Sequence, residues 1–264
     1  MTKKVKIEFP HFISQKLTRD IETILFDYSS GSQEINEKIL KLILRLHSKR
    51  TLKFLIEIFK DNFQTFQVVQ ETLNEIERNL DKEELNSIKQ KIRANLKANS
   101  KRIKAIFDKL KTKLKSDIKI LTISNSKTVY ETIRFIHSKN YKPEIFVLES
   151  KPGGEGILLY QKLKQLEMKV HLVKDKEMKK ILGQVDLILI GADKILLNKW
   201  FINKVKTKKL LTLAKQKELP VLLLAFREKI IKTETLIEHS QKLRPDKNLF
   251  EKIDLKLVDE ILIG

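Results

Sequence analysis

The sequence predicts an α/β protein in which an N-terminal helical domain precedes a domain built on a parallel sheet. Apolar residues recur every three to four positions through the first 115 residues, which is the period of helices packed on one face. From residue 116 onward, short apolar runs alternate with helical segments, as in a sheet covered on both faces. Five of the seven glycines fall between residues 153 and 191. The predicted domains are residues 1–115 and 116–264.

Helical periodicity divides the first domain into five segments. They are expected at 13–25, 35–46, 52–59, 63–80 and 85–114, and the last is long and basic. A turn is expected at 27–32 (DYSSGS), where Gly31 ends one helix and the serine hydroxyls cap the next one near Gln33. No Gly or Pro interrupts residues 32–141, which suits long helices.

The second domain alternates short apolar strands with helices. Strands are expected at 118–122, 145–148, 170–173, 187–190 and 221–226, and helices at 127–138, 156–167, 175–182 and 205–217. Ligands of such sheets bind at the carboxyl ends of the strands. The loops 122–128, 149–156 and 191–204, and the loop after residue 225, are therefore the places to look for chemistry.

Composition excludes several classes of protein. A chain of 264 residues with 41% hydrophobic residues has enough apolar side chains for a folded core. Without cysteine it has no disulfide, thiolate metal site or cysteine nucleophile. Its five histidines lack paired ligand spacing, and neither a P-loop nor a dinucleotide fingerprint occurs, so we expect no metal and no cofactor. The apolar runs are too short to span a bilayer, and we expect a cytoplasmic protein without membrane contact.

Positive charge is concentrated in one segment. The net charge is +20, and residues 91–120 alone hold eleven Lys and Arg against two Asp. Such a helix attracts nucleic acid or an acidic protein. A solvated helix face is the favoured explanation, because Phe107 is the only aromatic residue there that could stack on bases.

The loop after the first strand is rich in hydroxyl and amide groups. Thr122, Ser124, Asn125 and Ser126 stand where a strand gives way to a helix. The free N–H groups and positive dipole of a helix start suit a phosphate. Ordinary capping of the helix is the alternative interpretation.

Glycines cluster in the second loop. Gly153 and Gly154 allow backbone amides to approach a ligand closely, and Lys151 offers a positive charge for a phosphate. Glu149 and Glu155 are candidates for bonding sugar hydroxyls. A flexible surface turn is the alternative.

The third loop carries a carboxylate directly after a buried strand. Asp193 stands where a general acid or base would act, although a helix cap is the alternative. Asn203 and Lys204, with Thr207, form a further group of hydrogen-bond donors downstream. Their common placement at strand ends favours one shared site.

Six blocks together resemble one family. The blocks are LTISNSKTV (121–129), VLESKPGGEG (147–156), VDLILIGADKILLN (185–198), INKVKTKKLLTLAK (202–215), PVLLLA (220–225) and FEKIDLKLVDEIL (250–262). The chain resembles the alpha, beta and delta regulatory subunits of translation initiation factor 2B, a family that includes ribose-1,5-bisphosphate and methylthioribose-1-phosphate isomerases. The resemblance implies a Rossmann-like domain of the phosphosugar-isomerase and CoA-transferase type. It also implies a homo-oligomer, with dimers formed largely through the C-terminal domain.

The resemblance also implies roles for individual residues. In the isomerases a cysteine and an aspartate carry aldose–ketose proton transfer, and Ser124 and Asp193 match these two positions. Asn203 and Lys204 match a ligand-contacting pair, and Lys151 replaces the usual arginine. A serine hydroxyl is a far weaker acid than a thiol.

The resemblance with its departures therefore implies a non-catalytic, archaeal-type homologue. Such a protein would bind translation initiation factor 2 through the alpha subunit of that factor. It would also hold a phosphorylated sugar or nucleotide as effector. The alternative is an active isomerase of a phosphorylated ribose that uses Asp193, with Ser124 or another acid.

Overall fold

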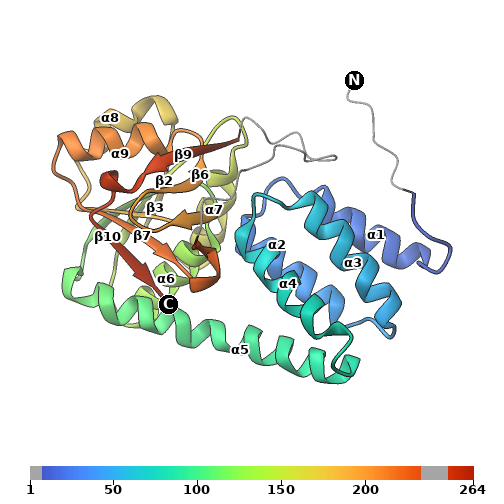
Figure 1. Ribbon diagram of the computed structural model, residues 1–264. Coiled ribbons are helices and arrows are strands. Elements are labelled where there is room, and N and C mark those ends of the chain that lie inside the picture. Colours follow the sequence, from blue (N-terminus) through green and yellow to red (C-terminus); the bar gives the residue numbers. More distant parts are fainter. Residues whose placement is uncertain (1–7, 233–248) are drawn as a thin grey trace.

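A computed structural model describes residues 8–232 and 249–264 of the chain. The predicted α/β class, with its helical N-terminal part, is confirmed (Figure 1). The N-terminal helices are α1 (Gln15–Leu25), α2 (Ser32–Ile43), α3 (Lys49–Asn62), α4 (Gln67–Leu80) and α5 (Leu85–Leu110), which a short 3-10 turn (Lys111–Lys113) extends.

The start of α2 differs from the sequence prediction. Gly31 is its N-cap residue, and no side chain caps the helix, so the expected serine cap is wrong. Two serines of this turn bond elsewhere: the Ser30 hydroxyl accepts a hydrogen bond from Lys38 Nζ at 2.8 Å, and the Ser29 hydroxyl donates to Asp27 Oδ1 at 2.8 Å. The first N–H groups of α2 are therefore not covered by a capping side chain.

Helix α5 belongs to two hydrophobic cores. Ile88 and Ile92 pack into the core of the N-terminal helices, whereas Ile106 and Leu110 pack into the core beneath the sheet. Figure 1 shows this helix running along both halves of the molecule. The domain boundary at residue 115 stays a prediction, because the second half of α5 shares its core with the following domain.

The main sheet has six strands, all parallel, in the order β10-β7-β4-β1-β2-β3. Their bounds are β1 Lys119–Ile123, β2 Glu144–Leu148, β3 Val170–Val173, β4 Leu187–Ile190, β7 Val221–Ala225 and β10 Glu260–Ile263. The five predicted strands are confirmed to within a residue at each end, and β10 is an addition that pairs with β7.

Both faces of this sheet are covered. Helices α6 (Lys127–Ser138) and α7 (Glu155–Lys164) pack on one face together with the end of α5. Helix α9 (Thr207–Gln216) and the short α8 (Met178–Ile181), which follows a 3-10 turn (Asp175–Glu177), cover the other face. The single predicted helix 175–182 is thus two short turns.

A second sheet occupies a region that the sequence predicts as loop. Its order is β8-β5-β6-β9, with β5 at Lys194–Leu196, β6 at Trp200–Lys204, β8 at Ile230–Ile231 and β9 at Phe250–Asp254. The prediction that Asn203 and Lys204 lie in a loop is therefore wrong, since both belong to β6. Among the described residues, no helix is long and apolar enough to cross a membrane.

Candidate functional site

Two small cavities lie where the strands end, under the turn that precedes α2. Ser124, Asp193 and Gly31 line both of them. Each cavity measures about 30 Å³, which leaves room for water but not for a phosphorylated ribose. The site is thus polar, only partly enclosed, and shared between the two halves of the chain.

Ser124 leaves β1 in an unusual backbone conformation. Its φ of 68° lies in the left-handed region, which non-glycine residues adopt rarely. The Ser124 N–H donates to Ser150 Oγ at 2.7 Å, and the Ser150 hydroxyl donates to the Leu148 carbonyl at 2.9 Å. These bonds tie the end of β1 to the end of β2 and hold Ser124 at the wall of both cavities.

Asn125 and Ser126 connect the next turn to its surroundings. Asn125 Nδ2 donates to the Ser29 carbonyl at 3.3 Å, and Asn125 Oδ1 accepts from Lys162 Nζ at the same distance. Ser126 Oγ accepts from the Val129 N–H at 3.4 Å, which makes it the N-cap of α6. The capping interpretation of Ser126 is therefore confirmed, while Asn125 joins the two halves of the protein.

A buried ion pair occupies one cavity. Lys204 Nζ donates to Glu155 Oε1, and both side chains are only 6% exposed. The ammonium group of Lys204 also lies 5.2 Å from the centre of the Phe250 ring. Among the described residues Glu155 Oε2 has no hydrogen-bond partner. The cation that a phosphate would bind is thus already neutralised by a carboxylate of this chain.

A second buried lysine stands beside Asp193. Lys229 Nζ donates to the Ala192 carbonyl at 2.5 Å, and the residue is only 3% exposed. Burial lowers the pKa of the Lys229 ammonium, and the charges of Asp193 and Glu228 oppose this shift. Burial also lowers the pKa of Lys194, the residue after Asp193. The aspartate therefore lies among buried cations.

The turn over the cavities is held by one carboxylate. Asp27 Oδ1 accepts from the N–H groups of Ser29 and Ser30, and Asp27 Oδ2 accepts from Lys38 Nζ at 2.5 Å. Burial raises the pKa of Asp27, but the hydrogen bonds from Lys38 and the two serines outweigh it and hold that pKa well below its usual range. The charged carboxylate fixes residues 28–31 above the strand ends.

Only some of the predicted site residues meet at the cavities. Those that line at least one of them are Ser124, Asn125, Ser126, Glu155, Asp193, Asn203 and Lys204. Thr122 lies inside β1 and is fully buried. Lys151 is exposed and bridges to Glu149 at 3.2 Å, and neither residue lines either of these two cavities. Gly153 and Gly154 lead into α7, where Gly154 is the N-cap with φ 72°.

Three contributions to the site were not predicted from sequence. Lys229 lies in the loop after residue 225, which the strand pattern marks for inspection, but no motif distinguishes it from the many other lysines. Gln33 and the turn 28–31 come from the helical domain, and the unusual DYSSGS segment was the signal that could have placed them. The described residues contain no group of three or more His, Asp or Glu arranged to hold a metal ion.

The arrangement defines a class of protein. Helices followed by a six-stranded parallel α/β domain, with polar strand ends covered by the helical part, are typical of α/β folds that bind ligands at the carboxyl ends of their strands. A family model, the Initiation factor 2 subunit family, matches residues 13–260. The chain belongs to this family.

Relatives of two kinds are similar in sequence. Translation initiation factor eIF2B subunit alpha of Caenorhabditis elegans is 32% identical over 113 residues, which are 43% of this chain and 37% of that protein. Ribose 1,5-bisphosphate isomerase of Archaeoglobus fulgidus is 27% identical over 113 residues, 43% of this chain and 36% of the isomerase. The matched part spans little more than a third of the length of either relative.

Solved structures share the fold across nearly the whole chain. The Pyrococcus horikoshii translation initiation factor eIF-2B superposes with a TM-score of 0.77 at 17% identity, covering 94% of this chain and 95% of that one. The 5-methylthioribose 1-phosphate isomerase of the same organism gives 0.66 at 20% identity, covering 92% and 82%. Both a translation factor and an enzyme therefore have this fold.

Proposed function

We propose that this chain is a non-catalytic, archaeal-type homologue of the factor 2B regulatory subunits, which binds translation initiation factor 2 through the alpha subunit of that factor in the cytoplasm. Family membership and the relative named as an eIF2B alpha subunit support this proposal. In this proposal the protein acts as a homo-oligomer, with a homodimer as the basic unit.

One observation favours the non-catalytic proposal over an isomerase. Where the isomerases are expected to have a thiol, this chain has Ser124, and the neighbouring lysine is neutralised by Glu155 within cavities of about 30 Å³. An aldose–ketose isomerase needs an acid and a base within reach of a bound sugar. Ser124 is a poor acid near neutral pH, and the cavities leave no room for the sugar.

An effector role follows from the remaining chemistry. Lys204 and Lys229 put two buried cations at the strand ends, and the uncapped start of α2 adds free N–H groups. In this proposal a phosphorylated sugar or nucleotide binds when the turn 28–31 moves away and Glu155 releases Lys204. The ligand therefore competes with the Glu155 carboxylate.

The test is a pull-down with purified factor 2 and with its isolated alpha subunit at several salt concentrations. We expect retention at low salt that weakens as salt rises, because both the charge of +20 and the exposed lysines favour an electrostatic contact. Lack of retention even at the lowest salt would contradict the proposal.

An isomerase acting on a phosphorylated ribose is the second candidate, favoured by one observation. Asp193 faces the same cavities as Ser124, and Lys229 lies next to it with a pKa lowered by burial. In this alternative Asp193 takes a proton from the sugar, and Lys229 supplies the protonated group that Ser124 lacks.

Incubation with ribose-1,5-bisphosphate or methylthioribose-1-phosphate, followed by NMR, separates the two candidates. The non-catalytic proposal expects no turnover. Turnover that Asp193→Asn abolishes would replace it with the isomerase, and retention of activity in Lys229→Met would exclude Lys229 as the acid.

A further inference from the structure

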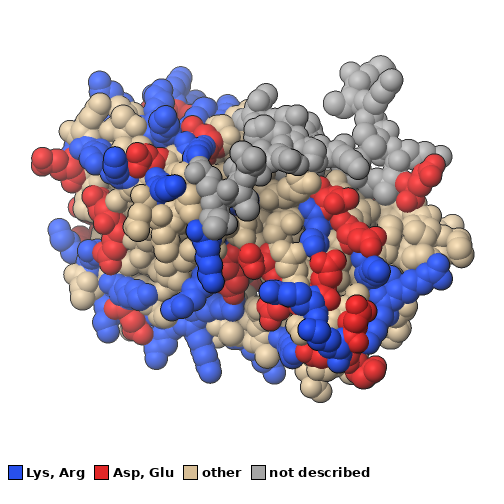
Figure 2. Space-filling model, in the orientation of Figure 1, with Lys and Arg blue, Asp and Glu red and all other residues tan. Residues whose placement is uncertain are grey.

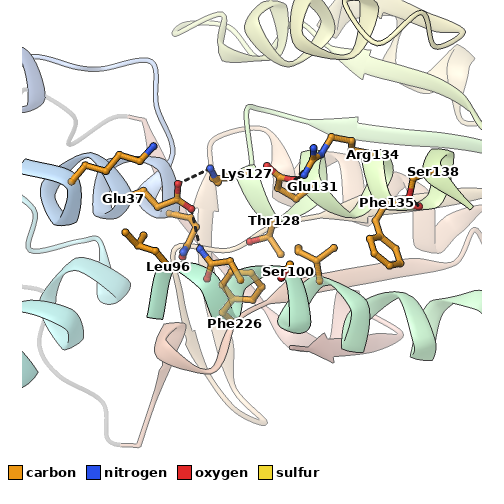
Figure 3. Close-up of a pocket in the computed structure, with 14 residues that line it drawn as sticks. Glu37, Leu96, Ser100, Lys127, Thr128, Glu131, Arg134, Phe135, Ser138 and Phe226 are labelled. Atoms are coloured by element: carbon orange, nitrogen blue, oxygen red, sulfur yellow. Dashed lines mark hydrogen bonds and ion pairs between the residues drawn. The ribbon is translucent and has the colours of Figure 1, made fainter. Parts of the chain in front are cut away.

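A groove of about 440 Å³ lies between α2, α5 and α6, next to the strand-end cavities, and shares Gln33 and Lys127 with one of them. Figure 3 shows Leu96 toward one end of it, Thr128 and Phe226 near its middle and Phe135 toward the other end. Ile103 of α5 also lines it. The volume is many times that of either cavity at the strand ends and holds several apolar side chains.

The polar groups at the edges of the groove are mostly paired with each other. Glu37 accepts from Lys127 Nζ at 2.8 Å and from Asn99 Nδ2 at 3.0 Å. Arg134 bridges to Glu131 at 2.6 Å within α6 (Figure 3). The two hydrogen bonds of Glu37 join α2 to α6 and to α5, so they connect the three helices that form the groove wall.

Helix α5, which forms one wall of the groove, also carries unpaired positive charge beside it. Arg93, Lys97, Lys101 and Lys104 recur on α5 at three-to-four spacing and form one exposed stripe, which we call the basic stripe. None of the four makes an ion pair with a described acidic residue, nor does the exposed Lys41 at the α2 edge of the groove.

The basic stripe flanks the groove. Leu96, Ser100 and Ile103 line the groove, and the stripe residues Lys97, Lys101 and Lys104 each directly follow one of them on the helix, about 100° further round the axis. In Figure 2, blue side chains project along the lower edge of the molecule, where α5 runs in Figure 1. The basic stripe thus runs along one side of the partly apolar groove.

We propose that this groove binds an acidic, amphipathic helical segment of a partner protein. The apolar face of such a segment fills the space over Leu96, Ile103 and Phe226, and its carboxylates pair with the basic stripe. The groove-lining part of α5, residues 96–103, spans about 10 Å, so it accepts about two turns of helix. This inference does not depend on the function proposed above.

Two other occupants fit the surface less well. Nucleic acid would use the cations but not the apolar floor, and the aromatic residues nearby are not free to stack, since Phe107 is buried and packs on Phe135 at 5.1 Å. A second copy of the chain would bring a net charge of +20 toward the basic stripe. Charge and apolar surface together favour the acidic segment.

The test measures fluorescence polarisation of a labelled model peptide of about 18 residues, with Leu at helical spacing on one face and Glu elsewhere. Matched probes are the same peptide with Gln in place of Glu, and a single-stranded RNA of similar length. The wild-type protein is compared with three variants. K97E/K101E/K104E reverses the charge of the basic stripe, and Ser100→Trp places an indole ring in the groove from an exposed position of α5. K176E/K179E/K180E is the control.

We expect saturable binding of the Glu peptide that weakens about tenfold or more in both groove variants and less than about twofold in the control. The control removes the same charge from exposed lysines in and beside α8, on the far side of the molecule from α5 (Figure 1). Circular dichroism spectra matching wild type verify that each variant is folded.

Three results would overturn the inference. The first is absence of saturable binding by the Glu peptide. The second is tighter binding of RNA that the stripe variant loses and Ser100→Trp keeps, which would mark a nucleic-acid surface. The third is a change of oligomeric state in Ser100→Trp by light scattering, which would mark a contact between copies of this chain.

Discussion

Replacing Glu155 by leucine leaves Lys204 as an uncompensated charge at the strand ends. Both side chains are 6% exposed, so water does not take over the role of the lost carboxylate. Removal of one partner from such a buried pair costs about 3–5 kcal/mol of folding free energy. Glu155→Leu is therefore expected to lower the free energy of unfolding by that amount.

Urea unfolding followed by circular dichroism measures this loss. For a chain of this size the midpoint is expected to fall by about 1–2 M, since each molar of urea removes about 2–3 kcal/mol. The double variant E155L/K204M turns the pair into two apolar side chains, and the methionine can keep the contact with the Phe250 ring. We expect it to recover most of the lost stability.

The reasoning fails in either of two cases. A loss below about 1 kcal/mol in Glu155→Leu would show that Lys204 is well solvated or paired elsewhere. A double variant no more stable than Glu155→Leu would show that the carboxylate acts through packing of the α7 start and not through the charge of Lys204.

Three further predictions test other parts of the structure. Because hydrogen bonds hold the pKa of Asp27 below its unfolded value, the contribution of this carboxylate to stability is present at neutral pH and is lost as pH falls below about 4. Asp27→Asn should therefore lower the melting temperature at pH 7 and weaken the fall of melting temperature with pH in the acid range. Gly156→Ala places a methyl 1.8 Å from the Leu148 carbonyl and should strongly reduce the melting temperature, whereas Gly183→Ala, with its nearest neighbour at 3.6 Å, should leave it within a few degrees. Ile106→Ala, at a fully buried position of α5, should cost about 2–5 kcal/mol in urea unfolding, and a cost under 1 kcal/mol would contradict its place in the core.

The strands of the main sheet could be predicted because each is a continuous apolar run. Leu187–Ile190 is buried at every position, and such a run followed by a Gly and a carboxylate indicates a strand that ends at a site. The fold class and the convergence of Ser124, Asp193 and Lys204 follow from these runs and from the order of the loops.

The second sheet could not be predicted from local pattern. Strand β5 has only three residues, and the chain turns after it at Asn198, whose φ is 63°. Strand β6 also pairs with β9, which lies about fifty residues later in the sequence. Pairing over such a distance leaves no local signal. For the same reason the sequence placed Glu155 and Lys204 at one site but not in contact with each other.

The continuity of α5 has a mechanical consequence. A helix of 26 residues is a stiff rod about 39 Å long, anchored at one end among the N-terminal helices and at the other beneath the sheet. A tilt of about 5° about one anchor moves the other by about 3 Å, which is comparable to the diameter of a water molecule. A force on the exposed middle of this helix therefore acts on both hydrophobic cores together.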